Sequence, residues 1–380
     1  MKKKIKFINL VGQYKSISGD MKKQFGKIFS NSSFVLREHV TKFEKEISKK
    51  LKVKYVVGLN SGTDALLMAL AQLNINKGDE IITPSHTYVA TVSAITHVGA
   101  KPVFVDITED FNLDPKKIEK KINKKTKAIL PVHLNGRSCE MRSIMKISKK
   151  YKIPVIEDAA QSFGTKFNGK FTGTFGQSGA FSLHPMKNLS VPGDGGFLVT
   201  NNKKIFQNVC LLRDHGRSRI KRNYKLKSEY LKCFGFNSRL DNIHASVALL
   251  KLKKIDNWIK KRIEIANYYH KFLESNKNLI IPKFYNDKNH NFFDTYNSYV
   301  IRVLKKRDKL KKFLEDNGIE VFIHMERGVH LEKYLKVGNW KLPKTEKLEK
   351  QILSIPIYPE LKISDQKFII SKINNFFKKN

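Results

Sequence analysis

Between about residues 50 and 200, short apolar runs alternate with segments in which apolar residues recur every three or four positions. The short runs predict strands, and the longer spacing predicts amphipathic helices. The predicted strands span residues 55–58, 80–83, 102–106, 128–133, 155–158 and 195–200. The predicted helices span residues 64–73, 88–96, 115–122 and 141–150. This alternation indicates an α/β fold with a mostly parallel central sheet flanked by helices, and the Val/Ile-rich runs indicate strands buried on both faces.

The pattern changes after about residue 245. The sequence predicts a long helix over 245–275, a strand over 299–303, a helix over 307–317, a strand over 320–323 and a final helix over 364–377. We therefore expect a large domain with the N-terminal segment (residues 1–245) and a small C-terminal α+β domain (residues 246–380).

The net charge is high: 73 Lys and Arg against 34 Asp and Glu give +39. The lysines occur in pairs along the whole chain, with no separate basic tail or zinc-finger spacing, so we expect neither nucleic-acid binding nor a metal site. A basic surface would still attract an anionic substrate. No apolar stretch is long enough to span a membrane, and the three cysteines predict no disulfide framework, so we expect a cytoplasmic protein.

Two charged residues stand out by their context. Asp158 ends a predicted buried strand, where open α/β sheets place ligand-binding groups. A carboxylate buried there needs a cationic partner or strong hydrogen bonds. Lys187 follows another apolar segment, with Ser182 before it and the turn Gly193-Asp-Gly-Gly196 after it. Burial would lower the pKa of such a lysine, as a Schiff-base lysine requires. Taken alone, each residue also fits a plain structural role.

Three further segments are weaker signals on their own. The turn at Gly62-Thr63 precedes a helix whose N-terminal N–H groups could bind a phosphate, or could simply be capped. Tyr88 could stack on a flat cofactor ring or belong to the core. Asn237 and Arg239 form a polar cluster before a helix, which could also be an ordinary capping segment.

Together these segments resemble the DegT/DnrJ/EryC1/StrS family of sugar aminotransferases, in the same order and over nearly the whole chain. The matching segments are Ser61-Gly-Thr-Asp-Ala-Leu66, Pro84-Ser-His-Thr-Tyr-Val-Ala90, Glu157-Asp-Ala-Ala-Gln161, Ser182 to Lys187, Gly193-Asp-Gly-Gly196 and Asn237-Ser-Arg-Leu-Asp241. The resemblance implies the aspartate-aminotransferase (type I) fold and the cofactor pyridoxal 5'-phosphate (PLP).

The resemblance also implies a role for each matching residue. Lys187 would carry PLP as a Schiff base and move the proton, and Asp158 would pair with the ring nitrogen. Gln161 would contact the phenolic oxygen, and Tyr88 would cover the ring. The phosphate would be held by Gly62, Thr63, Ser182 and, from the neighbouring subunit of a homodimer, Asn237. Residues expected on the substrate side are His330, Arg239 and His184.

Two segments depart from the family pattern on the substrate side, Phe34-Val-Leu-Arg37 and His324-Met-Glu-Arg-Gly-Val-His330. The expected reaction is transamination of a nucleotide-linked keto sugar, 3-keto rather than 4-keto, with L-glutamate as the amino donor by family habit. The product would be an amino sugar for surface polysaccharide or glycoconjugate biosynthesis. Two alternatives stay open. A PLP-dependent sugar dehydratase would carry His in place of Lys187, and a non-catalytic regulatory protein on this fold would have lost Lys187 or Asp158.

Overall fold

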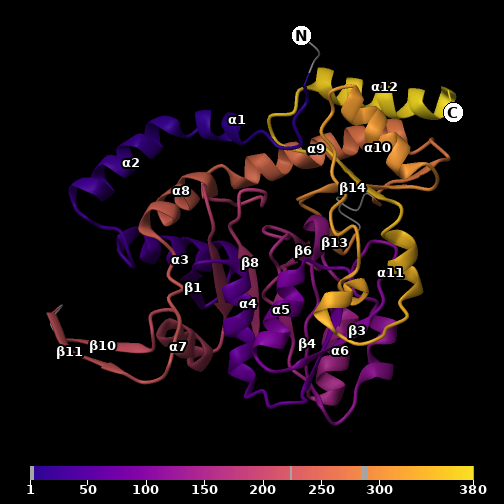
Figure 1. Ribbon diagram of the computed structural model, residues 1–380. Coiled ribbons are helices and arrows are strands. Elements are labelled where there is room, and N and C mark those ends of the chain that lie inside the picture. Colours follow the sequence, from indigo (N-terminus) through magenta and orange to yellow (C-terminus); the bar gives the residue numbers. More distant parts are fainter. Residues whose placement is uncertain (1–3, 223–224, 284–289, 380) are drawn as a thin grey trace.

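The computed structural model describes residues 4–222, 225–283 and 290–379 (Figure 1). A seven-stranded sheet forms the centre of the large domain, in the order β3-β2-β4-β5-β8-β9-β1, with β4 and β5 joined by two parallel bridges. Only β9 runs antiparallel to its neighbours, so the sheet is mostly parallel, as the sequence predicts. Its strands are β1 (Tyr55–Leu59), β2 (Glu80–Pro84), β3 (Lys101–Val105), β4 (Thr126–Ile129), β5 (Ile156–Asp158), β8 (Ser178–Ser182) and β9 (Gly196–Thr200).

Helices cover both faces of this sheet because successive strand residues point to opposite sides. Val57 and Ile81 pack on one face, against α4 (Gly62–Leu70), α5 (Val89–His97) and α7 (Lys203–Leu212). Their neighbours Val56 and Ile82 pack on the other face, against α3 (Glu38–Leu51) and α6 (Met141–Tyr151). The parallel strands are therefore buried on both sides, which explains their continuous apolar sequence.

The small domain is built on a three-stranded antiparallel sheet of β12 (Leu279–Ile280), β14 (Tyr299–Val303) and β15 (Ile352–Ile355). Three helices pack on it, α9 (Ile255–Leu273), α10 (Arg307–Asp316) and α12 (Ile363–Lys379), and α11 (Pro343–Leu348) precedes β15. The first described residues lie beside this domain, where Ile5 bridges to Ile319, and α1 (Leu10–Lys15) and α2 (Ser18–Ser30) lead across to α3 (Figure 1).

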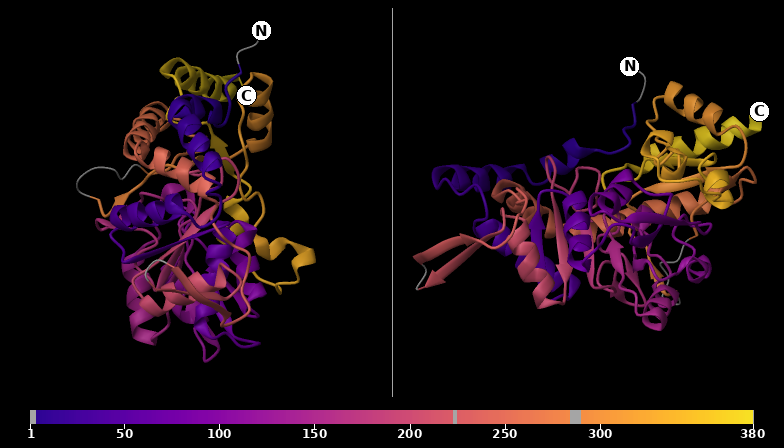
Figure 2. Two further views of the ribbon diagram at one scale, coloured as in Figure 1. Left: turned by 90° about the vertical axis from the view of Figure 1, so that its left-hand side faces the viewer. Right: turned by 60° about the horizontal axis from the view of Figure 1, so that its bottom comes forward.

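Two small β elements lie outside these sheets. The hairpin of β10 (Arg217–Arg222) and β11 (Lys225–Leu231) projects from the body of the molecule (Figure 2). A second sheet joins β6 (Lys166–Phe167) and β7 (Lys170–Phe171) to β13 (Phe292–Phe293). None of the described helices has the length and apolar character needed to cross a bilayer.

Three predicted elements are wrong in detail. Residues 115–122 form two 3₁₀ turns, capped by Asp114, because this lysine-rich segment buries only Ile118. Residues 245–275 form two helices, α8 (Asn242–Leu252) and α9, interrupted at Lys253-Lys254. The apolar face of α8 and the first turns of α9 pack into the core of the large domain, and the later turns of α9 pack into that of the small domain. Residues 320–323 form no strand but contact β15 through a single bridge at Phe322.

The predicted domain boundary at residue 245 falls within α8, which packs against α3 of the large domain. The division at that residue stays a prediction.

Candidate active site

A cavity of about 510 Å³ lies between the two domains, at the carboxyl ends of the parallel strands. It brings together eight of the residues predicted from the sequence: Gly62, Thr63, Tyr88, Asp158, Gln161, Ser182, His184 and Lys187. The first and last of these residues lie more than 100 positions apart in the sequence. The sheet brings them together at the edge where its parallel strands end.

Asp158 is the last residue of β5 and is 4% exposed. Its Oδ2 accepts a hydrogen bond from Thr91 Oγ1 at 2.8 Å, and its Oδ1 accepts one from the Ala160 N–H at 3.1 Å. Burial raises the pKa of this carboxyl, and these two hydrogen bonds oppose the rise. A cationic group in the cavity would therefore be a favourable partner for Asp158.

Lys187 lies in the loop between β8 and β9. The Leu183 N–H donates to the Gly195 carbonyl at 2.7 Å, and the Lys187 N–H donates to the His184 carbonyl at 2.9 Å, so both ends of the loop are fixed. Burial lowers the pKa of the Lys187 ammonium, and the charge of Asp158 opposes this. The amine is thereby favoured as the neutral nucleophile that attack on a carbonyl requires.

The N-terminus of α4 forms an anion site at one end of the cavity. Ser61 caps the helix by accepting a hydrogen bond from the Asp64 N–H at 3.0 Å, and the first turn opens toward Ser182. A Cβ at Gly62 would lie 2.8 Å from the Ser182 Cβ, so glycine permits this close approach of helix and strand. N–H groups of a first helical turn and a serine hydroxyl suit a phosphate.

Gln161 has a defined orientation. Its Oε1 accepts a hydrogen bond from the Asn135 N–H at 3.0 Å. The amide NH₂ is consequently left to donate into the cavity, where it suits an oxygen acceptor such as a phenolate.

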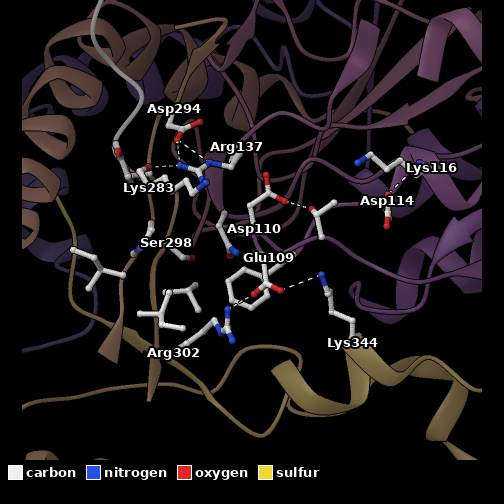
Figure 3. A pocket seen from close by; sticks show the side chains of 18 residues that line it. Glu109, Asp110, Asp114, Lys116, Arg137, Lys283, Asp294, Ser298, Arg302 and Lys344 are labelled. Carbon is white, nitrogen blue, oxygen red and sulfur yellow. Dashed lines mark hydrogen bonds and ion pairs between the residues drawn. The ribbon is translucent and has the colours of Figure 1, made fainter. Parts of the chain in front are cut away.

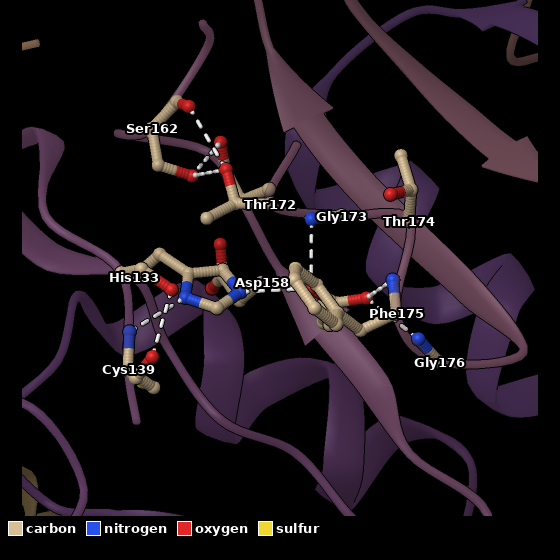
Figure 4. Close-up of polar contacts among 12 residues, drawn as sticks. His133, Cys139, Asp158, Ser162, Thr172, Gly173, Thr174, Phe175 and Gly176 are labelled. Atoms are coloured by element: carbon tan, nitrogen blue, oxygen red, sulfur yellow. Dashed lines mark hydrogen bonds and ion pairs between the residues drawn. The ribbon is translucent and has the colours of Figure 1, made fainter. Parts of the chain in front are cut away.

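A buried network supports the strand that carries Asp158. The neighbouring Glu157 is fully buried and accepts hydrogen bonds from the N–H groups of Gly173 (2.7 Å), Phe175 (2.6 Å) and Gly176 (2.7 Å). It also contacts His133 Nε2 at 3.0 Å. His133 Nδ1 accepts from the Cys139 N–H, which leaves the proton on Nε2 to be donated to Glu157. Figure 4 shows His133 and the loop of Gly173 to Gly176 around this strand.

Three predicted site residues do not line the cavity. His330 is buried between the domains, with Nδ1 2.6 Å from Ser85 Oγ and Nε2 3.5 Å from Glu346. Arg239 donates to Asp214 at 3.0 Å outside the cavity. Asn237 is exposed on the surface, bridged through its backbone to Asp214. Their proposed contacts with substrate or with a neighbouring subunit's cofactor stay predictions.

The small domain supplies lining residues that sequence reasoning missed, among them Arg262 and Asn297, and also His324 from the segment that departs from the family pattern. His324 packs against Phe7, and burial lowers the pKa of its imidazole to about 4. Arg262 follows Lys260-Lys261 in a lysine-rich helix, and its sequence context gives no signal that it is buried.

A second cavity, of about 420 Å³, has Glu109, Arg137, Asp294 and Arg302 in its lining (Figure 3). It contains none of the predicted site residues, and both of its arginines form ion pairs with carboxylates. Arg137 Nε donates to Asp294 at 2.9 Å, and Glu109 contacts both Arg302 and Lys344. Nowhere in the described residues do three or more His, Cys, Asp or Glu side chains gather to hold a metal ion. The cavity with Lys187 is therefore the candidate active site.

Its groups fit PLP one by one. Asp158 suits the protonated ring nitrogen, Lys187 the aldehyde, Gln161 the phenolic oxygen, and Ser182 with the first turn of α4 the phosphate. When bound, PLP supplies an electron sink for bonds at the substrate carbon that carries the amino group.

Comparison with known proteins agrees with this fit. The profile of the DegT/DnrJ/EryC1/StrS aminotransferase family matches residues 15–374. A pleiotropic regulatory protein of Geobacillus stearothermophilus is 35% identical, with 98% of this chain and 99% of that protein covered. The dTDP-3-amino-3,6-dideoxy-alpha-D-galactopyranose transaminase of Aneurinibacillus thermoaerophilus is 33% identical, with 94% and 95% covered. The structure of NtdA from Bacillus subtilis with bound cofactor PMP has a TM-score of 0.89 and 29% identity, and covers 99% of this chain and 85% of that one. The chain thus belongs to the DegT/DnrJ/EryC1/StrS aminotransferase family and is a PLP-dependent aminotransferase of the type I fold.

Proposed function

We propose that this enzyme transfers an amino group from L-glutamate to a nucleotide-linked keto sugar, with the keto group at C3 rather than C4. The observation that carries the proposal is the cavity in which Lys187 and Asp158 face one PLP-sized space. The name of the Aneurinibacillus relative, which specifies a 3-amino sugar, supports the sugar substrate and the C3 position. The amino sugar would serve surface polysaccharide or glycoconjugate biosynthesis.

Each residue has a defined task in such a reaction. Asp158 keeps the proton on the ring nitrogen, because a buried carboxylate favours a cation beside it. The Lys187 amine is held in the cavity by its fixed loop, and can take a proton from one carbon and return it to another. Ser182 and the first turn of α4 hold the phosphate, so that the reacting groups stay in place through both halves of the reaction.

The intact pair of Lys187 and Asp158 favours this proposal over the two alternatives from the sequence. A dehydratase would carry His at position 187, and a purely regulatory protein would have no need of a buried lysine with a lowered pKa. The relative named as a regulatory protein therefore does not change the proposal.

We further propose a homodimer in which Asn237 reaches the phosphate of the neighbouring subunit. Support comes from apolar side chains that are exposed near this residue: Leu231 is 71% exposed, and Phe234 is fully exposed. Tyr88, which lines the cavity, is itself 67% exposed, so a second subunit could complete the wall of the site there. The hairpin β10–β11, which projects from the body of the molecule (Figure 2), ends six residues before Asn237.

The direct experiment incubates the holoenzyme with L-glutamate and, in parallel, nucleotide-linked 3-keto and 4-keto sugars. We expect 2-oxoglutarate and a 3-amino sugar, identified by mass spectrometry and NMR. Formation of a 4-amino sugar alone would contradict the C3 assignment, and the absence of any amino sugar from both substrates would contradict the proposed function.

A further inference from the structure

Arg262 is a buried cation in the small-domain wall of the active-site cavity. It lies on α9 and is 2% exposed, yet its side chain lines the same cavity as Lys187 and Asp158. Burial lowers the pKa of its guanidinium to about 10, so the group is still charged at neutral pH.

The hydrogen bonds of Arg262 within the described residues all use one nitrogen. Nη1 donates to the main-chain carbonyls of Ile357 (2.8 Å) and Tyr296 (3.1 Å), with a longer contact to Asn297 (3.5 Å). These carbonyls come from two separate segments of the small domain and fix the plane of the guanidinium. The edge formed by Nε and Nη2 makes no hydrogen bond with the described part of the chain, and this is the edge that matches a carboxylate with two parallel N–H bonds.

The other buried arginines of the described chain differ in this respect. Arg137 forms an ion pair with Asp294, and Arg302 forms one with Glu109 (Figure 3). Arg262 has no carboxylate within ion-pair distance among the described residues; Glu360 acts on it only through its charge. A buried cation without an anionic partner is unfavourable, so an anion that enters the cavity would satisfy Arg262.

The remaining groups of the cavity narrow the choice of anion. The phosphate of the cofactor would be held by the first turn of α4 and Ser182, on the large-domain side, and its protonated ring nitrogen would pair with Asp158. Of the two substrates, the amino donor necessarily brings a carboxylate next to its reacting amine, whereas the keto sugar brings mainly hydroxyl groups to the reacting centre.

We propose that Arg262 binds a carboxylate of the amino donor. This inference rests on the proposed function, since it names the residue of that site that distinguishes the amino acid from the sugar. Arg262 is then a binding residue for one half of the reaction and is not needed in the other.

The two half-reactions test the assignment separately. Conversion of the PLP form by L-glutamate, and of the PMP form by a nucleotide-linked keto sugar, are each followed by absorbance in single-turnover experiments. In Arg262→Gln, we expect the concentration of glutamate for half-maximal rate to rise about 30- to 300-fold, as for loss of two charge-assisted hydrogen bonds. The keto-sugar half-reaction should change less than about threefold, within the range of a neutral substitution.

Arg302→Gln is the matched control, because it removes a buried arginine outside the cavity and should leave both half-reactions unchanged. If Arg262→Gln does not fold, Arg262→Lys is tested instead, because lysine keeps the positive charge but loses the two parallel hydrogen bonds to a carboxylate. Glutarate, which has no amino group, should compete with glutamate on the wild-type holoenzyme, and in Arg262→Lys its inhibition constant should rise about tenfold.

Three results would overturn the inference. An unchanged glutamate half-reaction in Arg262→Gln would show that no carboxylate binds there. Equal loss of both half-reactions would show a structural role, and loss of only the keto-sugar half-reaction would assign the anion to the sugar nucleotide. Failure of the wild-type enzyme to react with any amino acid is a different outcome, because it would refute the proposed function itself.

Discussion

Glu157→Gln should destabilise the protein far more than the nearly identical shapes of the glutamate and glutamine side chains suggest. The carboxylate of Glu157 accepts four hydrogen bonds: Oε1 accepts from Phe175 and Gly176, and Oε2 accepts from Gly173 and His133. A glutamine can keep two of them through its amide oxygen. Its NH₂ group would then face the Gly173 N–H and the His133 Nε2–H, which are both donors.

A change of the His133 tautomer does not remove the conflict. If the proton moved to Nδ1, it would meet the Cys139 N–H, which donates to that nitrogen in the native structure. At least two buried donors therefore lose an acceptor. At about 1–3 kcal/mol for each unsatisfied group, the free energy of unfolding should fall by about 2–6 kcal/mol, which is a large part of the ~5–15 kcal/mol typical of a domain.

The assay is urea denaturation of the apo-protein, with PLP affinity of the folded protein as a second readout. The affinity should fall as well, because Glu157 adjoins Asp158 and holds the loop under its strand. Glu119→Gln is the control, since Glu119 forms only a surface pair with Lys150, and its unfolding midpoint should match the wild type. A Glu157→Gln midpoint equal to that of the wild type would refute this account of the network.

Three further predictions follow from the site. Asp158→Asn should lower turnover about 100-fold or more, because the charge that stabilises the protonated ring nitrogen is lost; steady-state kinetics with saturating PLP will measure this, and near-normal turnover would contradict the role of Asp158. Gln161→Leu should shift the visible absorbance of the holoenzyme and its pH dependence, since the hydrogen bond to the phenolic oxygen is removed; an unchanged spectrum would argue against the contact. His86, whose pKa burial lowers from 6.5 to about 4, stays neutral in the fold while the unfolded chain takes up a proton. Protonation of His86 in the unfolded chain should therefore lower the free energy of unfolding by about 3 kcal/mol between pH 6.5 and pH 4. In pH-dependent denaturation, His86→Phe should reduce this loss of stability; an equal loss in His86→Phe would show that His86 is already charged in the fold.

The central sheet could be predicted from the sequence because its strands are buried on both faces. Val56 and Val57 pack into different cores on the two sides of β1, so the run must be apolar throughout. Asp158, at a strand end, and Lys187, in the loop after another strand, could be singled out from the sequence because the order of the motifs around them resembles that of the family. The 3₁₀ turns at 115–121 could not be predicted, because the lysine-rich pattern of this segment also fits an exposed helix. Only the structure shows how the segment packs around Ile118.

Arg262 and Glu157 were inaccessible to sequence reasoning for a different reason. The partners of Arg262 are main-chain carbonyls 34 and 95 positions away, and those of Glu157 are N–H groups of a loop 16–19 positions away. The sequence does not show which main-chain groups a side chain will contact, because nearly every residue carries the same ones. Only the fold shows these contacts. His330 was expected beside the substrate from the resemblance to the family; the structure shows its ring between Ser85 and Glu346, and its contact with substrate stays a prediction.

The central claim, that Lys187 holds the cofactor in this lysine-rich chain, is tested most directly by reduction with borohydride and peptide mapping. After reduction of the holoenzyme, mass spectrometry should find the pyridoxyl phosphate adduct on the peptide that contains Lys187, in a stoichiometry close to one per chain. Lys187→Ala should carry no adduct. An adduct distributed over other lysines, or persisting in Lys187→Ala, would contradict the account.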